Sequence, residues 1–230
     1  MSRREYGQAC SLACALDTVG ERWSLLVVRE LMLGPLRFSE LARAVGDVPT
    51  DVLTKRLRDL EADGLVARCR LDPPASATVY ELTELGRGLE RPLLELGRWG
   101  LGLQKLADVV DLTPTSLPGA LRVILDPPVG ATLTIGLRSG GQAYRLRIAK
   151  GWIVAERGEA KAPDLTLAGE PIAVVAALVV GGAAEDAVEV VGSREALEAL
   201  REMVAIPERL REEAIATFAQ PVAYESSLPS

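Results

Sequence analysis

Histidine is absent from this chain of 230 residues, and there are only 3 cysteines. Without histidine, neither a Ser-His-Asp triad nor a histidine-based metal site can form. The odd number of cysteines does not make a disulfide framework, and Cys10, Cys14 and Cys69 lack the paired Cys-x-x-Cys spacing of a structural zinc site. The sequence contains no Gly-Lys-Ser/Thr phosphate loop either. We therefore expect a protein that is not an enzyme and that has no cofactor and no metal.

Long apolar runs are also missing. No stretch approaches the roughly 20 apolar residues that are needed to span a bilayer. The first residues, Met-Ser-Arg-Arg-Glu-Tyr, lack the apolar run of a signal peptide. Together with the few cysteines, this favours a reducing cytoplasm and no membrane partner.

The chain lacks an excess of positive charge, since 26 basic and 32 acidic residues give a net charge of −6. Residues 1–108 hold 15 basic and 16 acidic groups, whereas residues 109–230 hold 11 and 16. The acidity therefore lies mainly in the second half. Nucleic-acid binding by the first half would depend on local basic patches rather than on net attraction.

The most informative segment is residues 37–83, which begins with a short amphipathic helix. Phe38, Leu41 and Ala42 mark its inner face, and Ser39 is the expected cap. A turn rich in Gly, Asp and Pro comes after it.

A second helix is next along the chain, with Thr50 as its expected cap. Leu53, Leu57 and Leu60 recur at i, i+4 and i+7 and must point inward. The opposite face holds Asp51, Thr54, Lys55 and Arg58, and it offers donors for phosphates and base edges. An isolated helix of this kind is usually just a solvated helix, so its interpretation depends on the neighbouring elements of the chain.

A hairpin is predicted after this helix, with strands at Val66–Leu71 and Thr78–Leu82 around a loop at 72–76. Arg68 and Arg70 lie two residues apart, hence on one face of the hairpin. Helix, turn, helix and basic hairpin form the order of a winged helix-turn-helix, whose second helix enters the major groove of DNA. The predicted DNA-binding residues are Arg37, Ser39, Thr50, Asp51, Thr54, Lys55, Arg58, Arg68 and Arg70.

Residues 10–100 also carry an ordered string of signatures. They are Cys10, Ala15-Leu16-Asp17, Gly20-Glu21-Arg22-Trp23, the run from Leu25 to Leu31, Gly34-Pro35, the run from Arg37 to Leu41, the run from Leu53 to Val66, and the run from Tyr80 to Gly86. The string resembles the HxlR family of bacterial winged-helix regulators. The resemblance implies a dimeric transcription factor with one recognition helix per subunit, bound to a double-stranded DNA operator. One departure is Ala77-Thr78-Val79, where the family often has a further basic residue in the wing.

Cys10 matches a position that some members of that family use to sense electrophiles or oxidants, and Arg3 and Arg4 nearby would favour its thiolate. The alternative is plain burial in an apolar neighbourhood.

The DNA-binding segment is flanked by further helices, predicted at Cys10–Leu16 and Arg22–Leu33 and from about residue 84 to 107. We expect Pro92 to bend the last of these. Its apolar stripe consists of Leu85, Leu89, Leu93, Leu96, Trp99, Leu103 and Leu106. This stripe exceeds what a small winged helix can cover, so the first helix and the 84–107 helix are the expected homodimer surface.

A turn-rich linker at 111–119 separates two predicted domains, residues 1–110 and 119–225. Beyond it the apolar period becomes strand-like, and helices come last. We predict strands at 121–125, 131–137, 142–148, 151–155 and 164–167, and helices at 171–180, 193–203 and 208–218. Tight turns are expected at Ser139-Gly140-Gly141 and Lys150-Gly151. Strands followed by helices indicate an α+β fold.

The second half resembles sterol carrier protein type two over roughly residues 119 to 205. The phrases that carry this are Gly151-Trp152-Ile153-Val154, the run from Ala162 to Pro171, and Val190-Val191-Gly192-Ser193-Arg194. The resemblance implies an apolar ligand tunnel between sheet and helices. Its predicted lining is Trp152, Leu165, Leu167, Val174, Val175, Leu178 and Val191, with ordinary core packing as the alternative.

The sequence thus favours a dimeric transcriptional regulator that responds to an apolar small-molecule effector. Two alternatives remain open. One is a thiol-based redox sensor in which the second domain only aids assembly, and the other is a lipid-binding carrier module whose winged helix serves protein contacts.

Overall fold

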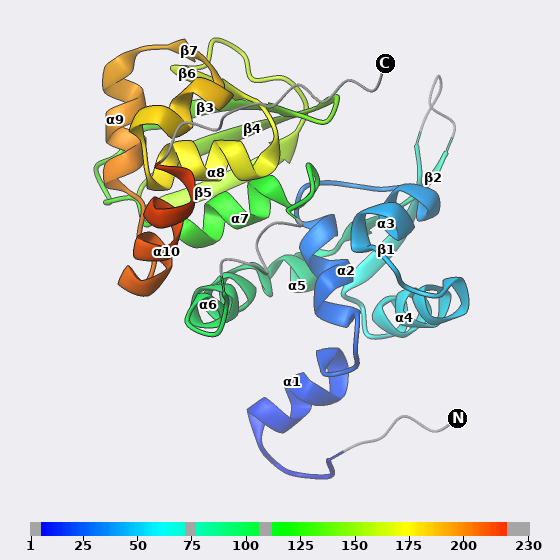
Figure 1. Cartoon of the computed structure of the whole chain (residues 1–230). Coiled ribbons are helices and arrows are strands. Elements are labelled where there is room, and N and C mark those ends of the chain that lie inside the picture. The colour runs from blue at the N-terminus through cyan, green and yellow to red at the C-terminus, as the bar shows by residue number, and fades with distance from the viewer. Residues whose placement is uncertain (1–5, 72–76, 106–111, 220–230) are drawn as a thin grey trace, which may run out of the picture. The chain divides into compact units, whose positions relative to one another are not determined.

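The computed structural model describes residues 6–71, 77–105 and 112–219 (Figure 1). The chain divides into two compact units, Met1–Leu96 and Gly97–Ser230. The limits of 1–110 and 119–225 stay a prediction about functional domains. Helices and strands occur in both units, in agreement with the predicted α+β class. None of the helices in the described ranges is both long enough and apolar enough to cross a membrane.

The first unit has the order of elements that the sequence predicts for a winged helix-turn-helix. Its elements are α1 (Ser11–Val19), α2 (Ser24–Leu31), α3 (Phe38–Val45), α4 (Thr50–Ala62), β1 (Val66–Arg70), β2 (Thr78–Leu82), α5 (Glu84–Arg87) and the start of α6 (Glu90–Leu101). Gly46 ends α3 with a φ of 94°, a left-handed conformation that favours glycine. The turn between α3 and α4 therefore lies where the sequence places it.

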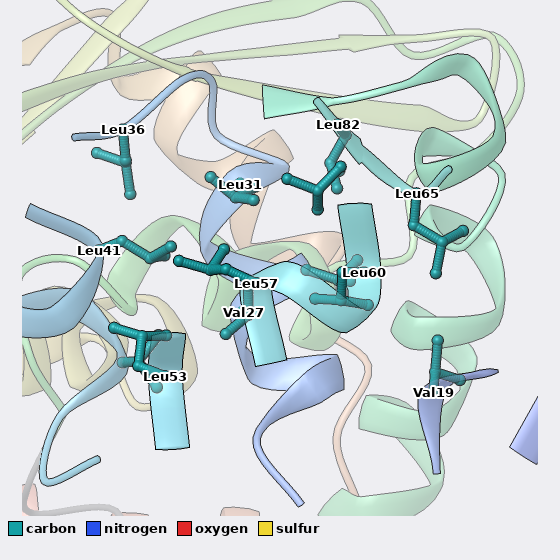
Figure 2. Close-up of a cluster of buried hydrophobic side chains, with 13 residues drawn as sticks. Val19, Val27, Leu31, Leu36, Leu41, Leu53, Leu57, Leu60, Leu65 and Leu82 are labelled. Carbon is teal, nitrogen blue, oxygen red and sulfur yellow. The ribbon is translucent and has the colours of Figure 1, made fainter. Parts of the chain in front are cut away.

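The core of this unit is made by aliphatic side chains from α2, α3, α4 and the β1–β2 hairpin. Figure 2 shows Leu41 of α3 beside Leu57 and Leu53 of α4, with Val27 of α2 in the same cluster. Each of these four side chains is at most 1% exposed. Burial of a leucine contributes about 1.5–3 kcal/mol, so this cluster fixes α4 against α2 and α3 and leaves the other face of α4 outward.

The two predicted helix caps are wrong. The N-cap of α3 is Arg37, and Ser39 lies inside the helix. The Arg37 backbone N–H donates to Glu40 Oε2 at 2.8 Å, so the Glu40 carboxylate takes the capping role that was expected of Ser39. The N-cap of α4 is Pro49, and no side chain caps that helix. Proline leaves no hydroxyl to accept from the first turn.

The helix predicted from about 84 to 107 is broken into α5 and α6, and the break falls at 88–89 rather than at Pro92. Gly88, a residue of low helix propensity, lies at this break. Pro92 lies in the first turn of α6, where its missing N–H costs nothing. Gly86 makes the close packing of α5 possible, because a Cβ there would lie 2.1 Å from the Leu65 carbonyl oxygen. Residues 106 and 107 lie outside the described ranges.

The second unit contains a sheet of five strands in the order β5-β4-β3-β6-β7. Besides the end of α6, its elements are α7 (Leu117–Ile124), β3 (Leu133–Ser139), β4 (Gln142–Ala149), β5 (Trp152–Arg157), β6 (Leu165–Ala168), α8 (Pro171–Val179), the 3-10 helix η2 (Gly182–Ala187), β7 (Glu189–Gly192), α9 (Arg194–Glu202) and α10 (Glu208–Phe218). Strands β3 and β6 are parallel, and the other neighbours are antiparallel. Both predicted turns are confirmed: Gly140-Gly141 and Lys150-Gly151 have positive φ at both positions.

One face of this sheet is buried and the other is open. Ile135, Leu146 and Leu165 are fully buried, while Arg145 and Arg147, which alternate with Leu146 along β4, are exposed. In Figure 1, α7 and α8 lie against one face of the sheet. The alternation along the strands therefore separates a helix-covered core from a solvated face.

Helix α8 is almost wholly apolar, and its C-terminal carbonyls are satisfied by arginines from later helices. Arg201 donates to the Ala177 carbonyl oxygen through Nε at 3.0 Å and a terminal nitrogen at 2.6 Å, and Arg211 donates to the Val179 carbonyl oxygen at 3.2 Å. The last carbonyls of a helix have no partner within the helix, and at a buried end water cannot reach them, so these arginines provide their hydrogen bonds.

The strand predicted at 121–125 is wrong, because residues 117–124 form helix α7. Leu117, Leu121 and Ile124 recur at i, i+4 and i+7 and are buried. The helix begins inside the predicted linker, so the predicted strand at 121–125 covered only the second half of α7. A run of five residues is too short for its period to separate strand from helix.

Candidate DNA interface

The outward face of α4 carries the polar residues that the sequence predicted. Asp51, Lys55 and Arg58 are all exposed, while Leu53, Leu57 and Leu60 on the opposite face are buried. Within the described residues, none of the three polar side chains takes part in a hydrogen bond or an ion pair that would occupy it. The face can therefore donate to and accept from a ligand.

The other predicted residues near α3 and α4 are placed differently. Thr54 is half-buried, and its hydroxyl donates to the Thr50 carbonyl oxygen at 2.7 Å. The hydroxyl proton of Thr54 is therefore used within the helix, so only its methyl group and the lone pairs of its hydroxyl oxygen remain for contact with a ligand. Thr50 and Ser39 are exposed in the first turns of α4 and α3, and Arg37 is exposed at the start of α3.

Arg68 and Arg70 lie on one face of β1, as predicted, and both are exposed. Their cross-strand neighbours in β2 are Tyr80 and Thr78. Tyr80 also pairs with Leu36 through two backbone hydrogen bonds of 2.8 and 3.0 Å, so the hairpin is fixed to the segment before α3. The predicted loop at 72–76 lies outside the described residues.

Two arginines that the sequence interpretation did not single out belong to the same region. Arg43 is exposed on α3, the helix that crosses the DNA backbone in this motif. Arg56 is the reverse case: it lies on α4 but its side chain is only 7% exposed, and it pairs with Asp59 at 3.1 Å and Glu21 at 3.6 Å. On a helical wheel Arg56 lies beside Leu60, at the edge of the leucine face, and this position could have identified it as an inward residue.

Cys10 is exposed, so the predicted alternative of burial is wrong. It is the N-cap of α1, and the backbone N–H groups of Ala13 and Leu12 beside it lower the pKa of its thiol. Cys69 differs, because its thiol donates to Glu81 Oε1 at 3.0 Å and this hydrogen bond raises its pKa. Arg3 and Arg4 lie outside the described residues.

The predicted pocket residues of the second unit are mostly core. Leu165, Leu167, Val174 and Leu178 are at most 2% exposed, and Val175 and Trp152 are half-buried. Val191 is 57% exposed on the edge strand β7, so its assignment to a pocket lining is wrong. Val191 pairs with Thr166 and therefore points to the open face of the sheet.

An open surface pocket of about 560 Å³ does occur in this unit, but it lies elsewhere, at the β3–β4 turn. Its lining residues are Arg138, Ser139, Gly140, Gly141, Gln142, Ala143, Glu159, Gly169 and Glu170. Two of these residues, Arg138 and Glu159, form an ion pair at 3.1 Å. This pocket shares no residue with the predicted apolar lining.

Comparison with known proteins places the first part of the chain in a family. The model of the HxlR-like helix-turn-helix family matches residues 18–106. The uncharacterized HTH-type transcriptional regulator Rv3095 of Mycobacterium tuberculosis is 41% identical over 100 residues, which are 44% of this chain and 61% of the relative. The chain thus spans less than two thirds of the length of that relative. The uncharacterized HTH-type transcriptional regulator YkvN of Bacillus subtilis is 38% identical over 92 residues, 40% of this chain and 78% of YkvN.

Solved structures show similar coverage. The reduced form of the transcriptional regulator YodB from B. subtilis is 30% identical, covering 40% of this chain and 91% of YodB with a TM-score of 0.37. The oxidized form of the redox regulator HypR is 33% identical, covering 42% of this chain and 99% of HypR with a TM-score of 0.39. With the winged helix-turn-helix order of the first unit and the sequence identity to YkvN over most of its length, the chain belongs to the HxlR-like helix-turn-helix family of transcriptional regulators.

Proposed function

We propose that this protein is a sequence-specific DNA-binding transcriptional regulator. Helix α4 contacts the base edges of the operator, and the β1–β2 wing contacts the DNA phosphates. The observation that carries the proposal is the outward face of α4, where Lys55 and Arg58 are exposed and have no partner among the described residues, while the leucines opposite hold the helix in place. Arg68 and Arg70 add a second basic site on the wing.

A gel-shift series on the upstream region of the protein's own gene tests this. We expect the double variant Lys55→Ala/Arg58→Ala to lose most of its affinity, because good base contacts are worth about 1–3 kcal/mol each. Arg145→Ala, which removes an exposed arginine of β4, is the matched control and should bind as the native protein does. Unchanged binding by the folded double variant would show that α4 is not the reader.

The protein acts as a homodimer in this proposal. Large apolar side chains are exposed on α1 and in α6, namely Leu12 at 67%, Leu96 at 49% and Trp99 at 67%. Isolated exposed apolar residues are ordinary, but several on two helices indicate a surface that a partner covers. In sedimentation experiments the native protein should have the mass of a dimer, and Leu12→Glu/Trp99→Glu should have that of a monomer.

We also propose that an apolar effector acts through the second unit, in line with the resemblance to sterol carrier protein type two. The wholly apolar helix α8 and the strand β6 supply a suitable lining. Because Leu165, Val174 and Leu178 are packed as core, an effector must part α8 from β6 to enter. Its effect on DNA binding equals its differential affinity for two arrangements of the dimer.

A second candidate is thiol-based sensing by Cys10. It is favoured by the exposure of Cys10 and by the backbone N–H groups at the start of α1 that lower the pKa of its thiol. Diamide should then weaken DNA binding of the native protein and spare Cys10→Ser. A change in DNA binding when lipid extracts are added to a cysteine-free variant would support the effector proposal rather than the thiol proposal. Lipid uptake by a protein that does not bind DNA would indicate a carrier module.

A further inference from the structure

The outward face of α4 has an ordered charge pattern along its length. Asp51, Lys55 and Arg58 stand at i, i+4 and i+7, so they fall on one narrow stripe of the helix. An acidic residue four positions before a lysine is the usual arrangement for an ion pair within a helix. Here Asp51 and Lys55 do not pair, nor does either side chain bond to another described residue. Both groups remain available to a ligand.

The length of this stripe matches a short run of base pairs. Seven residues of α-helix rise about 10.5 Å, and stacked bases lie about 3.4 Å apart. The stripe therefore spans about three base-pair steps when α4 lies in the major groove, with Asp51 at the N-terminal end that reaches the base edges. The helix has 13 residues, so its C-terminal turns continue beyond the stripe.

The chemistry of the three side chains selects among the bases. A carboxylate only accepts hydrogen bonds, and cytosine presents only the N4 amino donor in the major groove. Guanine presents two acceptors, O6 and N7, which suit the donors of lysine and arginine. A carboxylate opposite guanine or beside phosphates is repelled, so Asp51 discriminates by penalty as well as by attraction.

We propose that Asp51 selects a cytosine through its N4 amino group and that Lys55 and Arg58 select guanines in the operator half-site. This inference rests on the proposed function of α4 as the reading helix. An acidic residue in the first turn also stabilises a helix in any protein, because its charge interacts favourably with the helix dipole. That role predicts a change in stability when Asp51 is replaced, but no change in base preference.

The test is selection from a random double-stranded DNA library with the full-length protein, with sequencing of the bound fraction. The native protein should enrich a motif with C·G at one position, preferred by about 5- to 100-fold over the other pairs, as one base contact permits. Asp51→Ala should level the four bases at that position and leave its neighbours unchanged. Asp51→Asn should shift the preference to adenine, because an asparagine amide matches adenine N6 and N7. Lys55→Gln should weaken the guanine preference at a different position of the same motif.

Glu61→Gln is the matched control, since it neutralises a carboxylate at the other end of α4, away from the stripe. It should return the native motif. If no variant and not even the native protein enriches a motif, the proposed function itself fails. If a motif is enriched and Asp51→Asn leaves every position unchanged, the regulator stands and the base assignment is wrong. Circular dichroism identifies a variant that does not fold, and Asp51→Glu then provides the second test, because it keeps an acceptor and should keep the cytosine.

Discussion

Arg56 links α4 to the turn between α1 and α2, and the cost of breaking this link should depend on which partner is removed. The Arg56 side chain is 7% exposed, whereas its partners Glu21 and Asp59 are 52% and 37% exposed. Removing both carboxylates leaves a buried cation without its partners, which costs about 3–5 kcal/mol in comparable cases. Removing the cation instead leaves two carboxylates that water already reaches.

We therefore expect Glu21→Ala/Asp59→Ala to destabilise α4 by about 3 kcal/mol, and Arg56→Met, which keeps most of the apolar stem, by about 1 kcal/mol or less. The triple variant should recover most of the loss of the double variant, because it removes the unpaired cation. Alanine is a good helix former, so helix propensity does not explain a loss at position 59.

Hydrogen–deuterium exchange of peptides from α4 measures these changes locally in the full-length protein. A loss of about 3 kcal/mol corresponds to exchange that is faster by roughly 100-fold or more. Glu156→Ala is the control: the Arg145–Glu156 pair is short, at 2.7 Å, but both side chains are about half exposed, at 46% and 48%, so its removal should change little. Equal losses in Arg56→Met and the double variant, or no recovery in the triple variant, would refute this account.

The sequence predicted most fully the elements with a strong period. Strand β2 and helix α10 have the predicted bounds of 78–82 and 208–218, and α4 is confirmed with its leucines inward. In these segments the apolar residues that set the period are also those that pack, so a local pattern contains the information about the fold.

The candidate site was predictable where it depends on the helix wheel, and not where it depends on contacts between distant residues. The outward position of Lys55 results from the leucines of α4 alone. The burial of Arg56 depends on Glu21, which lies 35 positions earlier and is brought near only by the packing of α2 against α4. The alternative of a buried Cys10 was wrong because its apolar neighbours in sequence, such as Leu12, are themselves exposed.

The remaining predictions concern the wing, the thiols and the second unit. If Arg68 and Arg70 contact phosphates as proposed, Arg68→Ala/Arg70→Ala should weaken binding to all DNA sequences alike and reduce the slope of log K against log salt by about 2. Titrations at several salt concentrations measure this slope, and a change in base preference without a change in slope would contradict the prediction. Iodoacetamide should alkylate Cys10 at lower pH than an ordinary thiol, because the pKa of Cys10 is lowered and its thiolate persists as the pH falls. Alkylation of Cys69 should require a higher pH, because the pKa of Cys69 is raised. Mass spectrometry of the labelled peptides gives both pH profiles, and identical profiles would contradict these two pKa shifts. Leu178→Trp should cost about 1–3 kcal/mol by overpacking, because Leu178 is 2% exposed on α8. If an apolar effector enters between α8 and β6, the larger ring fills the space that opens there, so the variant should lose displacement of a fluorescent fatty acid and still bind DNA. Uptake that persists in the folded variant would place the effector elsewhere, and no uptake by the native protein with any lipid tried would leave the second unit without an apolar ligand.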